Sequence, residues 1–270
     1  MNSLLFIGAG SMGSAILGQV VSRGVLDVSR LAAYDIDGSR LEAPGKLGVR
    51  LLESLDETGR FDAVLLAVKP KDVPSVCAKL PGLMAENGLV VSIAAGVTIG
   101  SIEGWIGRPT AVSRVMPNIN LLSASGMSAA SFNASADAEQ KKLVLDIFSS
   151  VGDVIEVDES KLNAVTGLSG SGPAYAALFI SALTDGGVKS GLTNAEAYRL
   201  ALQTVGGTVE TLRKLGCVPE QLKNMVSSPG GTTIDAVHSL EKNRFRAAVI
   251  DAVETATHKA ELLGAKGAKK

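Results

Sequence analysis

Three glycines near the start of the chain have the spacing of a phosphate-binding turn. They belong to the run Gly8-Ala9-Gly10-Ser11-Met12-Gly13, which lies between an apolar segment typical of a strand and a segment with helical periodicity. In such a turn Gly8 allows the sharp bend, Gly10 lets the backbone approach a pyrophosphate, and Gly13 allows close packing of helix on strand. The helix N-terminus near Ser11 offers unpaired N–H groups. The run therefore predicts a dinucleotide site that includes Ser11 and Met12, the alternative being a turn that binds nothing.

An acidic residue follows this run at the distance expected for ribose recognition. Asp35 lies about twenty residues after Gly13, at the end of a second predicted strand, where a carboxylate can bind the ribose hydroxyls of an adenosine. This position favours NAD over NADP. Arg40 and Arg50 are close enough in the sequence to bind a 2′-phosphate instead, although both are also typical of solvated surface charges. The expected cofactor is therefore NADPH or NADH.

Other residues that could carry chemistry are scarce. The two histidines, His238 and His258, fall in segments with helical periodicity, and we interpret both as helix surface residues. Cys77 and Cys217 are far apart and have no Cys-x-x-Cys spacing and no neighbouring histidine pair. We expect both cysteines to pack as small apolar side chains, and we expect no metal site.

The elements that must position these residues change in kind along the chain. Up to about residue 152, strand-like and helical segments alternate, which predicts βαβ units around a mostly parallel sheet. The predicted strands are Leu4–Gly8, Arg30–Asp35, Ala63–Val68, Leu89–Ala94, Ala111–Val115 and, closing the sheet, Asp153–Val157. After Ser160 only helical periodicity remains. The predicted helices are Leu162–Gly191, Asn194–Gly216, Pro219–Met225, Thr233–Lys242 and Arg244–Leu263, followed by a frayed tail from Gly264. We expect an α/β, Rossmann-like dinucleotide-binding domain of residues 1–159 and an all-helical domain of residues 160–270.

The overall composition excludes several classes of protein. Hydrophobic residues make up 46% of the chain and charged residues 20%, which is typical of a globular protein. The formal charge is -1 and there is no basic stripe, so we expect no nucleic-acid partner. No run approaches the roughly 18 uninterrupted apolar residues of a membrane span, and the first residues lack the pattern of an export signal. We therefore expect no membrane partner and a cytoplasmic location.

Four segments resemble those of pyrroline-5-carboxylate reductases. Besides the glycine run, they are Ala67-Val68-Lys69-Pro70, Ser169-Gly170-Ser171-Gly172-Pro173-Ala174-Tyr175 and Ser227-Ser228-Pro229-Gly230-Gly231-Thr232-Thr233. The last segment, continuing from Ile234 to Glu241, is the most specific. The resemblance implies a reductase that passes a hydride from NAD(P)H to the C=N bond of 1-pyrroline-5-carboxylate, giving L-proline in the last step of proline biosynthesis.

The resemblance also implies which residues surround the cofactor. Two loops are expected at the carboxyl ends of parallel strands, where open α/β sheets bind ligands. Their residues are Ala67, Val68, Lys69 and Pro70 in the first loop and Ala94, Ala95 and Gly96 in the second. Met116 and Asn118, from a Met-Pro-Asn motif after the next strand, are expected to contact the nicotinamide end and the substrate.

The segment Ser228–Thr233 is expected to bind the substrate. It precedes a predicted helix, so its backbone N–H groups and hydroxyls can gather around a carboxylate. By resemblance, Ser228, Gly231 and Thr232 hold the carboxylate of the substrate. Thr233 hydrogen-bonds its ring nitrogen and is the predicted catalytic residue. A purely structural alternative is a helix start capped by Thr232 or Thr233.

The segment Pro173–Leu183 would be apolar on nearly every side as a helix, so it needs cover from its own chain or from a partner. The resemblance is to a family of interlocked dimers. It implies that the helical domain binds substrate and dimerises, giving a homodimer or a higher homo-oligomer. In that dimer each active site combines the dinucleotide domain of one subunit with the partner's substrate loop.

Two other functions compete with this interpretation. A β-hydroxyacid dehydrogenase also has a dinucleotide domain followed by a helical domain, and Gly167–Gly172 is similar to its second glycine motif. That family, however, has a catalytic lysine where this chain has Ala176, and alcohol oxidation needs a group that takes the hydroxyl proton. A protein that only senses the nicotinamide cofactor would keep the glycine run. The intact Ser228–Thr233 segment argues against that possibility.

Overall fold

A computed structural model describes residues 3–56 and 59–267 of the 270-residue chain. The chain forms two compact units. The first contains the residues up to Ser171 together with those from Glu254 onward, and the second is Gly172–Val253. The boundary between Val253 and Glu254 falls inside the last helix of the chain, so this helix contributes to both units.

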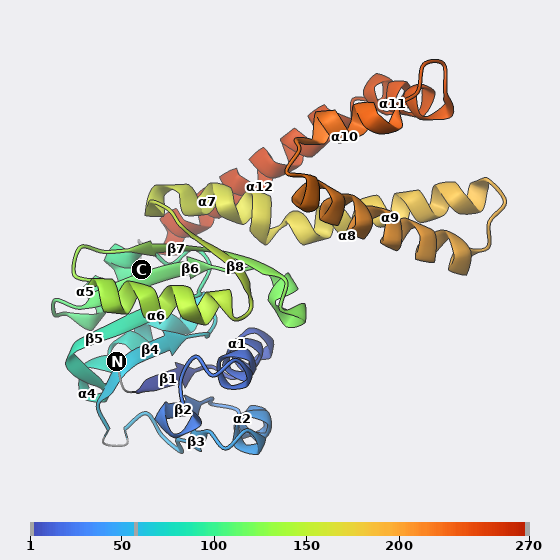
Figure 1. Ribbon diagram of the computed structural model, residues 1–270. Helices are drawn as coiled ribbons and strands as arrows, with labels where there is room; N and C mark the ends of the chain where they lie inside the picture. The colour runs from blue at the N-terminus through green and yellow to red at the C-terminus, as the bar shows by residue number, and fades with distance from the viewer. Residues whose placement is uncertain (1–2, 57–58, 268–270) are drawn as a thin grey trace. The chain divides into compact units, whose positions relative to one another are not determined.

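The first unit is built around an eight-stranded sheet (Figure 1) with the order β3-β2-β1-β4-β5-β6-β7-β8. Its strands are β1 (Leu4–Ile7), β2 (Leu31–Tyr34), β3 (Arg50–Leu51), β4 (Phe61–Leu66), β5 (Met84–Ser92), β6 (Ala111–Met116), β7 (Gly126–Phe132) and β8 (Gly152–Glu156). Every neighbouring pair is parallel except β6 and β7. Strand order reverses between β1 and β4, which places a ligand crevice at the carboxyl ends of these strands.

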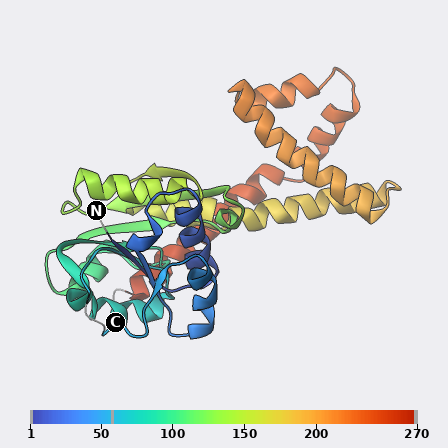
Figure 2. The same cartoon turned by 60° about the horizontal axis from the view of Figure 1, so that its bottom comes forward.

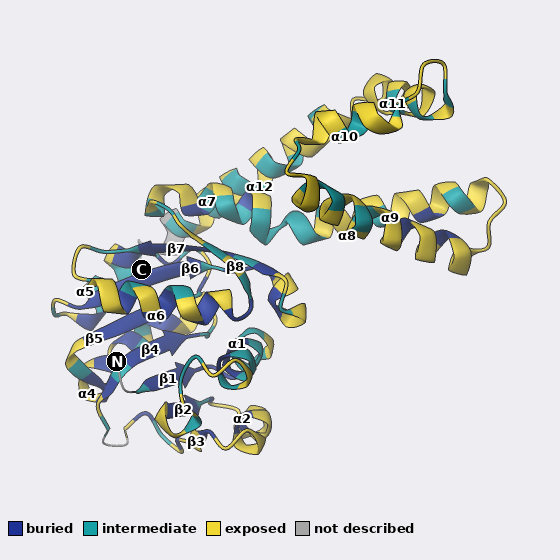
Figure 3. Ribbon diagram, in the orientation of Figure 1, coloured by how far each residue is buried: buried dark blue, intermediate teal, exposed yellow. Residues whose placement is uncertain are grey.

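Helices cover both faces of this sheet, as a mostly parallel sheet requires. One face carries α1 (Ser11–Ser22), α2 (Glu42–Lys46) and α6 (Ala138–Ser149), and the other carries α3 (Val73–Cys77), α4 (Leu80–Leu83) and α5 (Ile99–Ile106). Alternate residues of β1 point into the two cores: Phe6 faces α1 and α6, whereas Ile7 faces the opposite core. The central strands, such as β1, β4 and β6, are accordingly the most buried part of the unit (Figure 3), whereas β3 and β8 are largely exposed.

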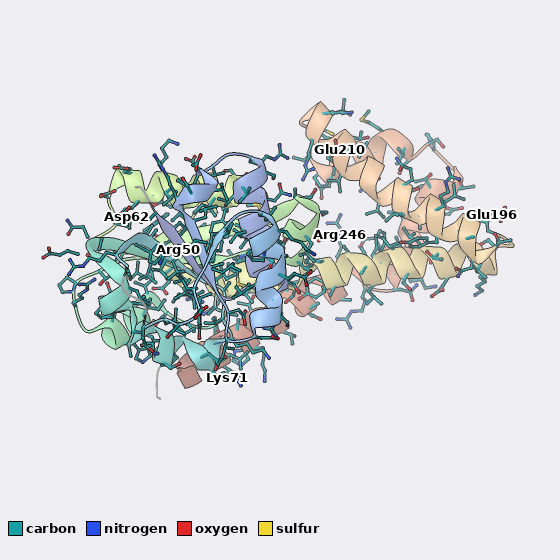
Figure 4. The ribbon with its side chains drawn as sticks, turned by 90° about the horizontal axis from the view of Figure 1, so that it is seen from below. Arg50, Asp62, Lys71, Glu196, Glu210 and Arg246 are labelled. Carbon is teal, nitrogen blue, oxygen red and sulfur yellow. The ribbon has the colours of Figure 1, made fainter. Side chains whose placement is uncertain are left out.

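The remaining elements are helical. They are α7 (Leu162–Val165), a π-helical segment (Thr166–Gly170), α8 (Gly172–Lys189), α9 (Asn194–Leu215), α10 (Pro219–Val226), α11 (Thr232–Lys242) and α12 (Phe245–Gly267). In the second unit α8 and α9 pack side by side, joined by a turn that Figure 2 shows clearly. A capping box of Thr193 and Glu196 starts α9 at this turn, where Figure 4 labels Glu196.

The second unit has almost no core of its own within one chain. Its described residues include only three that are buried, Thr184, Ala197 and Ala201. By contrast, α8 leaves Leu178 72% exposed and α9 leaves Leu200 56% exposed (Figure 3). A unit of this size cannot be stable with so little buried apolar surface, so its exposed faces need cover.

Most of the predicted architecture is confirmed. The mostly parallel sheet, the glycine turn between β1 and α1, and the wholly helical region after residue 160 all agree with the sequence. Two strands were not predicted. β3 has two residues, and β7 is Gly-Met-Ser-Ala-Ala-Ser-Phe, whose small residues carry little strand preference. Strand β7 forms because β6 and β8 pair with its two edges.

Two further predictions about the helices were wrong. Leu162–Gly191 is not one α-helix, because the π-helical segment interrupts it and Lys189 ends α8. The tail is not frayed from Gly264, because α12 continues to Gly267, while residues 268–270 lie outside the described residues. Within the first unit Gly264 lies against the loop at Gly96: a Cβ added at Gly264 would be 3.6 Å from the Gly96 carbonyl oxygen.

Candidate active site

A cavity of about 760 Å³ lies in the first unit at the carboxyl ends of β1, β4 and β5. This volume is in the usual range for a ligand pocket. The cavity brings together most of the predicted cofactor residues, namely Gly8, Gly10, Ser11, Met12, Asp35, Ala67, Val68, Lys69, Pro70, Ala94 and Ala95. Gly13 and Gly96 were also predicted and are not among the lining residues. The fold therefore creates the expected crevice at the point where strand order reverses.

The three glycines of the turn have different structural roles. Gly8 has a φ of +103°, and a Cβ added there would lie 2.5 Å from the Ala67 carbonyl oxygen. A Cβ on Gly13 would overlap the Gly8 carbonyl oxygen. Gly10, in contrast, has an ordinary φ of −66°, and a Cβ on it would meet no atom within 4 Å. Gly8 and Gly13 are thus required by the fold, whereas Gly10 leaves an open cradle on the cavity that suits a pyrophosphate.

Helix α1 begins at this cradle without a side-chain cap. Gly10 is its N-cap and can offer no side-chain acceptor to the first turn. The N–H groups of that turn, beginning at Ser11, are therefore available to an anion, and the helix dipole adds a partial positive charge. This arrangement fits the phosphates of a dinucleotide.

Asp35 is buried and is already tied into the turn. Its Oδ2 accepts a hydrogen bond of 2.7 Å from the Ala9 N–H, and its Oδ1 accepts one of 2.9 Å from the Asp37 N–H. Its side chain still lines the cavity, as does that of Arg40, whose Nη1 lies 3.8 Å from the Asp35 Oδ2. Arg50, on β3 (labelled in Figure 4), is not among the lining residues. Of the two arginines considered for a 2′-phosphate, the structure thus brings only Arg40 to the cavity.

A partly buried ion pair holds the second cofactor loop. Arg114, on β6, donates from Nη1 to Glu159 Oε1 at 3.1 Å, and the Arg114 side chain is only 6% exposed. The same Glu159 oxygen accepts a hydrogen bond of 2.8 Å from the Ile99 N–H, in the first turn of α5. Because α5 follows Ala94–Gly96 directly, this carboxylate fixes the end of the loop that lines the cavity.

Met116 and Asn118 lie at the end of β6. Asn118 is buried, and its side chain donates to Ser169 of the π-helical segment. The Met116 methyl group lies against Gly170 of that segment, since a Cβ added at Gly170 would lie 2.8 Å from Met116 Cε. Direct contact of Met116 and Asn118 with nicotinamide or substrate stays a prediction.

The segment Ser228–Thr233, in the second unit, forms a turn and a helix start. Pro229 and Gly230 are its central residues, Gly230 has a φ of +67°, and the Gly231 N–H donates to the Ser228 carbonyl at 3.1 Å. These features define a type II turn. A Cβ at Gly231 would overlap the Ser228 Oγ, so the hydroxyl lies directly beneath this glycine.

Helix α11 starts at Thr232, one residue earlier than predicted, and its N-cap is Gly231. The alternative in which Thr232 or Thr233 caps the helix is therefore wrong: there is no side-chain cap. Within the described part of the chain, no hydrogen bond engages the hydroxyls of Ser228, Thr232 or Thr233. The helix N-terminus and three hydroxyls are thus available to a ligand.

Several cavity residues were missed by the sequence prediction. They are mainly Tyr34, Ile36, Lys71, Asp72, Ser75, Lys79 and Ile93. Lys71 (Figure 4) and Asp72 directly follow the predicted Lys69-Pro70, so their position after β4 could have identified them. Tyr34 and Ile93 lie near the carboxyl ends of the predicted strands Arg30–Asp35 and Leu89–Ala94 and could have been found in the same way. Ser75 and Lys79 lie in and just after α3, for which the sequence defined no bounds.

Other predicted features also have clear positions. Cys77 is buried in the core beside α3, and burial raises the pKa of its thiol to about 12, so it is an inert apolar residue. None of the helices in the described ranges is long and apolar enough to cross a membrane.

Two protein-family models match different parts of the chain. Residues 159–263 match a family model described as pyrroline-5-carboxylate reductase dimerisation. Residues 3–96 match a model described as NADP oxidoreductase, coenzyme F420-dependent. The first match contains the Ser228–Thr233 turn, and the second contains the glycine turn.

Similar proteins cover nearly the whole chain. A pyrroline-5-carboxylate reductase of Methanosarcina acetivorans is 40% identical over 263 residues, spanning 97% of each chain. One from Escherichia coli is 38% identical over 260 residues, spanning 96% of this chain and 97% of its own. A solved structure of a pyrroline-5-carboxylate reductase from Coxiella burnetii superposes with a TM-score of 0.92 at 34% identity, covering 97% of this chain and 98% of the other.

A solved structure from Plasmodium falciparum, a pyrroline carboxylate reductase with NADP bound, superposes with a TM-score of 0.84 at 35% identity over 97% of this chain and 98% of its own. A 3-hydroxyisobutyrate dehydrogenase from Mycobacterium tuberculosis shares the fold alone, with a TM-score of 0.51 at 13% identity over 86% of this chain and 72% of the other. From the relatives of about 40% identity over nearly its whole length, this chain belongs to the pyrroline-5-carboxylate reductase family.

Proposed function

We propose that this chain reduces the C=N bond of 1-pyrroline-5-carboxylate to give L-proline, using NADPH or NADH. Its relatives of 37–43% identity over nearly the whole chain carry the name of this activity. Thr233 is the catalytic residue in this proposal, and Ser228, Gly231 and Thr232 bind the carboxylate of the substrate. A cytoplasmic location stays a prediction from the sequence.

The observation that carries the proposal is the uncapped start of α11. A helix N-terminus without a side-chain cap, next to hydroxyls without internal partners, is a site for a carboxylate. The substrate has a C=N bond in its ring and a carboxylate on the ring carbon bonded to that nitrogen. Anchoring the carboxylate at Ser228–Thr232 would leave the Thr233 hydroxyl to hydrogen-bond the ring nitrogen.

The remaining chemistry requires position more than strong acids or bases. When bound, the reduced nicotinamide supplies the hydride that adds to the carbon of the C=N bond. The ring nitrogen gains a proton, and a hydrogen bond from Thr233 would favour the developing amine. Holding the two reactants face to face can account for much of the acceleration, because effective molarities of well-oriented reactants are large.

A direct assay tests this function. The purified chain should oxidise NADPH or NADH when pyrroline-5-carboxylate is present and should not respond to buffer alone. Incubation with 3-hydroxyisobutyrate and oxidised cofactor should give no reduction. Turnover of the hydroxyacid without turnover of the imine would assign the chain to the rival dehydrogenase class, and no turnover with any substrate would support a sensing role.

We further propose that the active form is a homodimer or a larger homo-oligomer assembled through the helical unit. The support is the exposed apolar surface of α8 and α9 in a unit with only three buried residues among those described. A stable partner surface buries such side chains. Light scattering should give a mass of at least twice the 27.7 kDa of one chain. An active monomer would contradict this proposal.

A further inference from the structure

Every hydrogen-bonding group of the Asn118 side chain is engaged within the first unit. Its Oδ1 accepts hydrogen bonds from the N–H groups of Asn120, at 3.2 Å, and Met127, at 3.1 Å. Its Nδ2 donates to the Ser169 carbonyl oxygen at 3.2 Å and to the Ser169 hydroxyl at 3.3 Å. A primary amide has two donors and one double acceptor, so this side chain is fully satisfied. It is also only 6% exposed.

These bonds connect β6 to a segment with unusual geometry. Thr166–Gly170 is a π-helix, closed by a hydrogen bond of 2.9 Å from the Ser171 N–H to the Thr166 carbonyl oxygen. Single π-helical turns inside α-helices are rare and frequently occur at functional sites. The Met116 methyl group packs closely on Gly170, where an added Cβ would lie 2.8 Å from Met116 Cε. Asn118 and Met116 together hold this turn against the end of β6.

The register of the sheet places this turn on the path of the cofactor. In the β5–β6 ladder Ser92 pairs with Arg114, so Ile93–Ala95 leave the sheet beside the last residues of β6, Val115 and Met116, which are still paired with β7. Asn118 follows two residues after the end of β6, at the same carboxyl edge. Ile93, Ala94 and Ala95 line the dinucleotide cavity. A dinucleotide whose pyrophosphate lies at Gly10 and which continues past Ala95 would therefore bring its nicotinamide end toward β6.

We infer that Asn118 is a positioning residue, which fixes Ser169 and the Thr166–Gly170 turn as a wall of the nicotinamide site. It acts through Ser169, since its own donors and acceptors are occupied. This inference rests on the proposed reductase function. A wall that moves by about 1 Å would leave the adenosine and pyrophosphate contacts in place but misalign the hydride donor, which can cost on the order of 10²-fold in turnover.

The variant Asn118→Asp tests this role with minimal change of shape. It keeps an acceptor for the two backbone N–H groups. Its second carboxylate oxygen replaces the Nδ2 donor opposite the Ser169 carbonyl oxygen, so the hydrogen bond to Ser169 is lost. Asn120→Asp is the matched control, because Asn120 is exposed and makes no side-chain hydrogen bond among the described residues. At pH 8 we expect Asn118→Asp to lower kcat about 10- to 100-fold, with dinucleotide affinity nearly unchanged. Asn120→Asp should match the wild type.

Three further readouts separate positioning from a general loss of structure. A protonated carboxyl group at position 118 can donate to the Ser169 carbonyl oxygen, so the kcat of Asn118→Asp relative to wild type should recover as the pH is lowered. The primary isotope effect with 4-deuterated cofactor should increase, because hydride transfer becomes more rate-limiting. Hydrogen exchange of the Ser171 amide should accelerate, and this measurement needs no turnover.

Some results would overturn the inference. Wild-type kcat in Asn118→Asp would do so, as would equal losses of kcat, dinucleotide affinity and thermal stability. Unchanged exchange at Ser171 would show that Asn118 does not hold the turn. Failure of the wild-type protein to reduce pyrroline-5-carboxylate would instead contradict the proposed function, and exchange at Ser171 together with dinucleotide titration would still report on the turn.

Discussion

Replacing Gly10 with valine should separate cofactor binding from folding. The backbone of Gly10 has a φ of −66°, which any residue adopts, and a Cβ there meets no atom within 4 Å. The folded chain can therefore accept the side chain. The main cost to stability is the poor performance of valine as an N-cap, which is about 1 kcal/mol relative to the better caps.

The cost to binding should be much larger. The methyl groups would occupy the cradle through which a pyrophosphate reaches the N–H groups at the start of α1. Losing two hydrogen bonds to a charged phosphate, each worth about 1.5–3 kcal/mol, would weaken binding by at least about 3 kcal/mol. Since 1.4 kcal/mol corresponds to a factor of ten, the Kd for NADH or NADPH should rise by about 10²-fold or more.

Titration of dinucleotide fluorescence, together with thermal unfolding, measures both quantities. Gly18→Ala is the matched control on the same helix: its Cβ also meets no atom within 4 Å, but Gly18 is not among the cavity residues. That variant should bind like the wild type. Gly13→Ala is the opposite control and should unfold, because its Cβ overlaps the Gly8 carbonyl oxygen. If Gly10→Val binds dinucleotide normally, or loses as much stability as Gly13→Ala, the assignment of the cradle is wrong.

Four other outcomes are expected. Thr233→Val should lower kcat about 10- to 100-fold at nearly constant dinucleotide affinity, because it loses a hydrogen bond to the reacting nitrogen. Thr233→Ser should retain much of the wild-type activity. Wild-type turnover in the valine variant would remove Thr233 from the mechanism. Asp35→Asn keeps an acceptor for the Ala9 N–H but loses the charge, so kcat/KM should shift toward NADPH, and an unchanged ratio means that Asp35 is not the selector. Mixing inactive Gly10→Val with inactive Thr233→Ala under verified subunit exchange should restore activity if each site combines two subunits, and no recovery contradicts a shared site. Burial raises the pKa of Cys77 to about 12 from 9.0, so at pH 8.5 iodoacetamide should modify Cys217 but not Cys77. Folding stability should fall as the pH rises above about 9, because only the thiol of the unfolded chain ionises there. Rapid alkylation of native Cys77 would contradict its burial.

The sequence alone was sufficient for the features that local rules control. Alternation of strand-like and helical segments predicted the parallel sheet, because each element carries its own hydrophobic period. The spacing of Gly8, Gly10 and Gly13 predicted the turn, because only a strand, a sharp bend and a helix start suit those glycines. The Ser228–Thr233 segment indicated the family by resemblance to the motif of pyrroline-5-carboxylate reductases, and the type II turn and helix start that it forms were seen only in the structure.

Tertiary structure decided what depends on neighbours distant in the sequence. Strand β7 has a weak strand preference of its own and exists because β6 and β8 supply partners for both of its edges. The spacing of the three glycines predicted a different role for each, but the contacts behind those roles are tertiary: the Ala67 carbonyl oxygen leaves no space for a Cβ at Gly8, whereas a Cβ at Gly10 meets no atom within 4 Å. Asn118 meets Ser169 across 51 residues of chain, a contact that no local periodicity encodes. Periodicity and spacing specify elements, whereas the partners of a buried amide are set by how those elements pack.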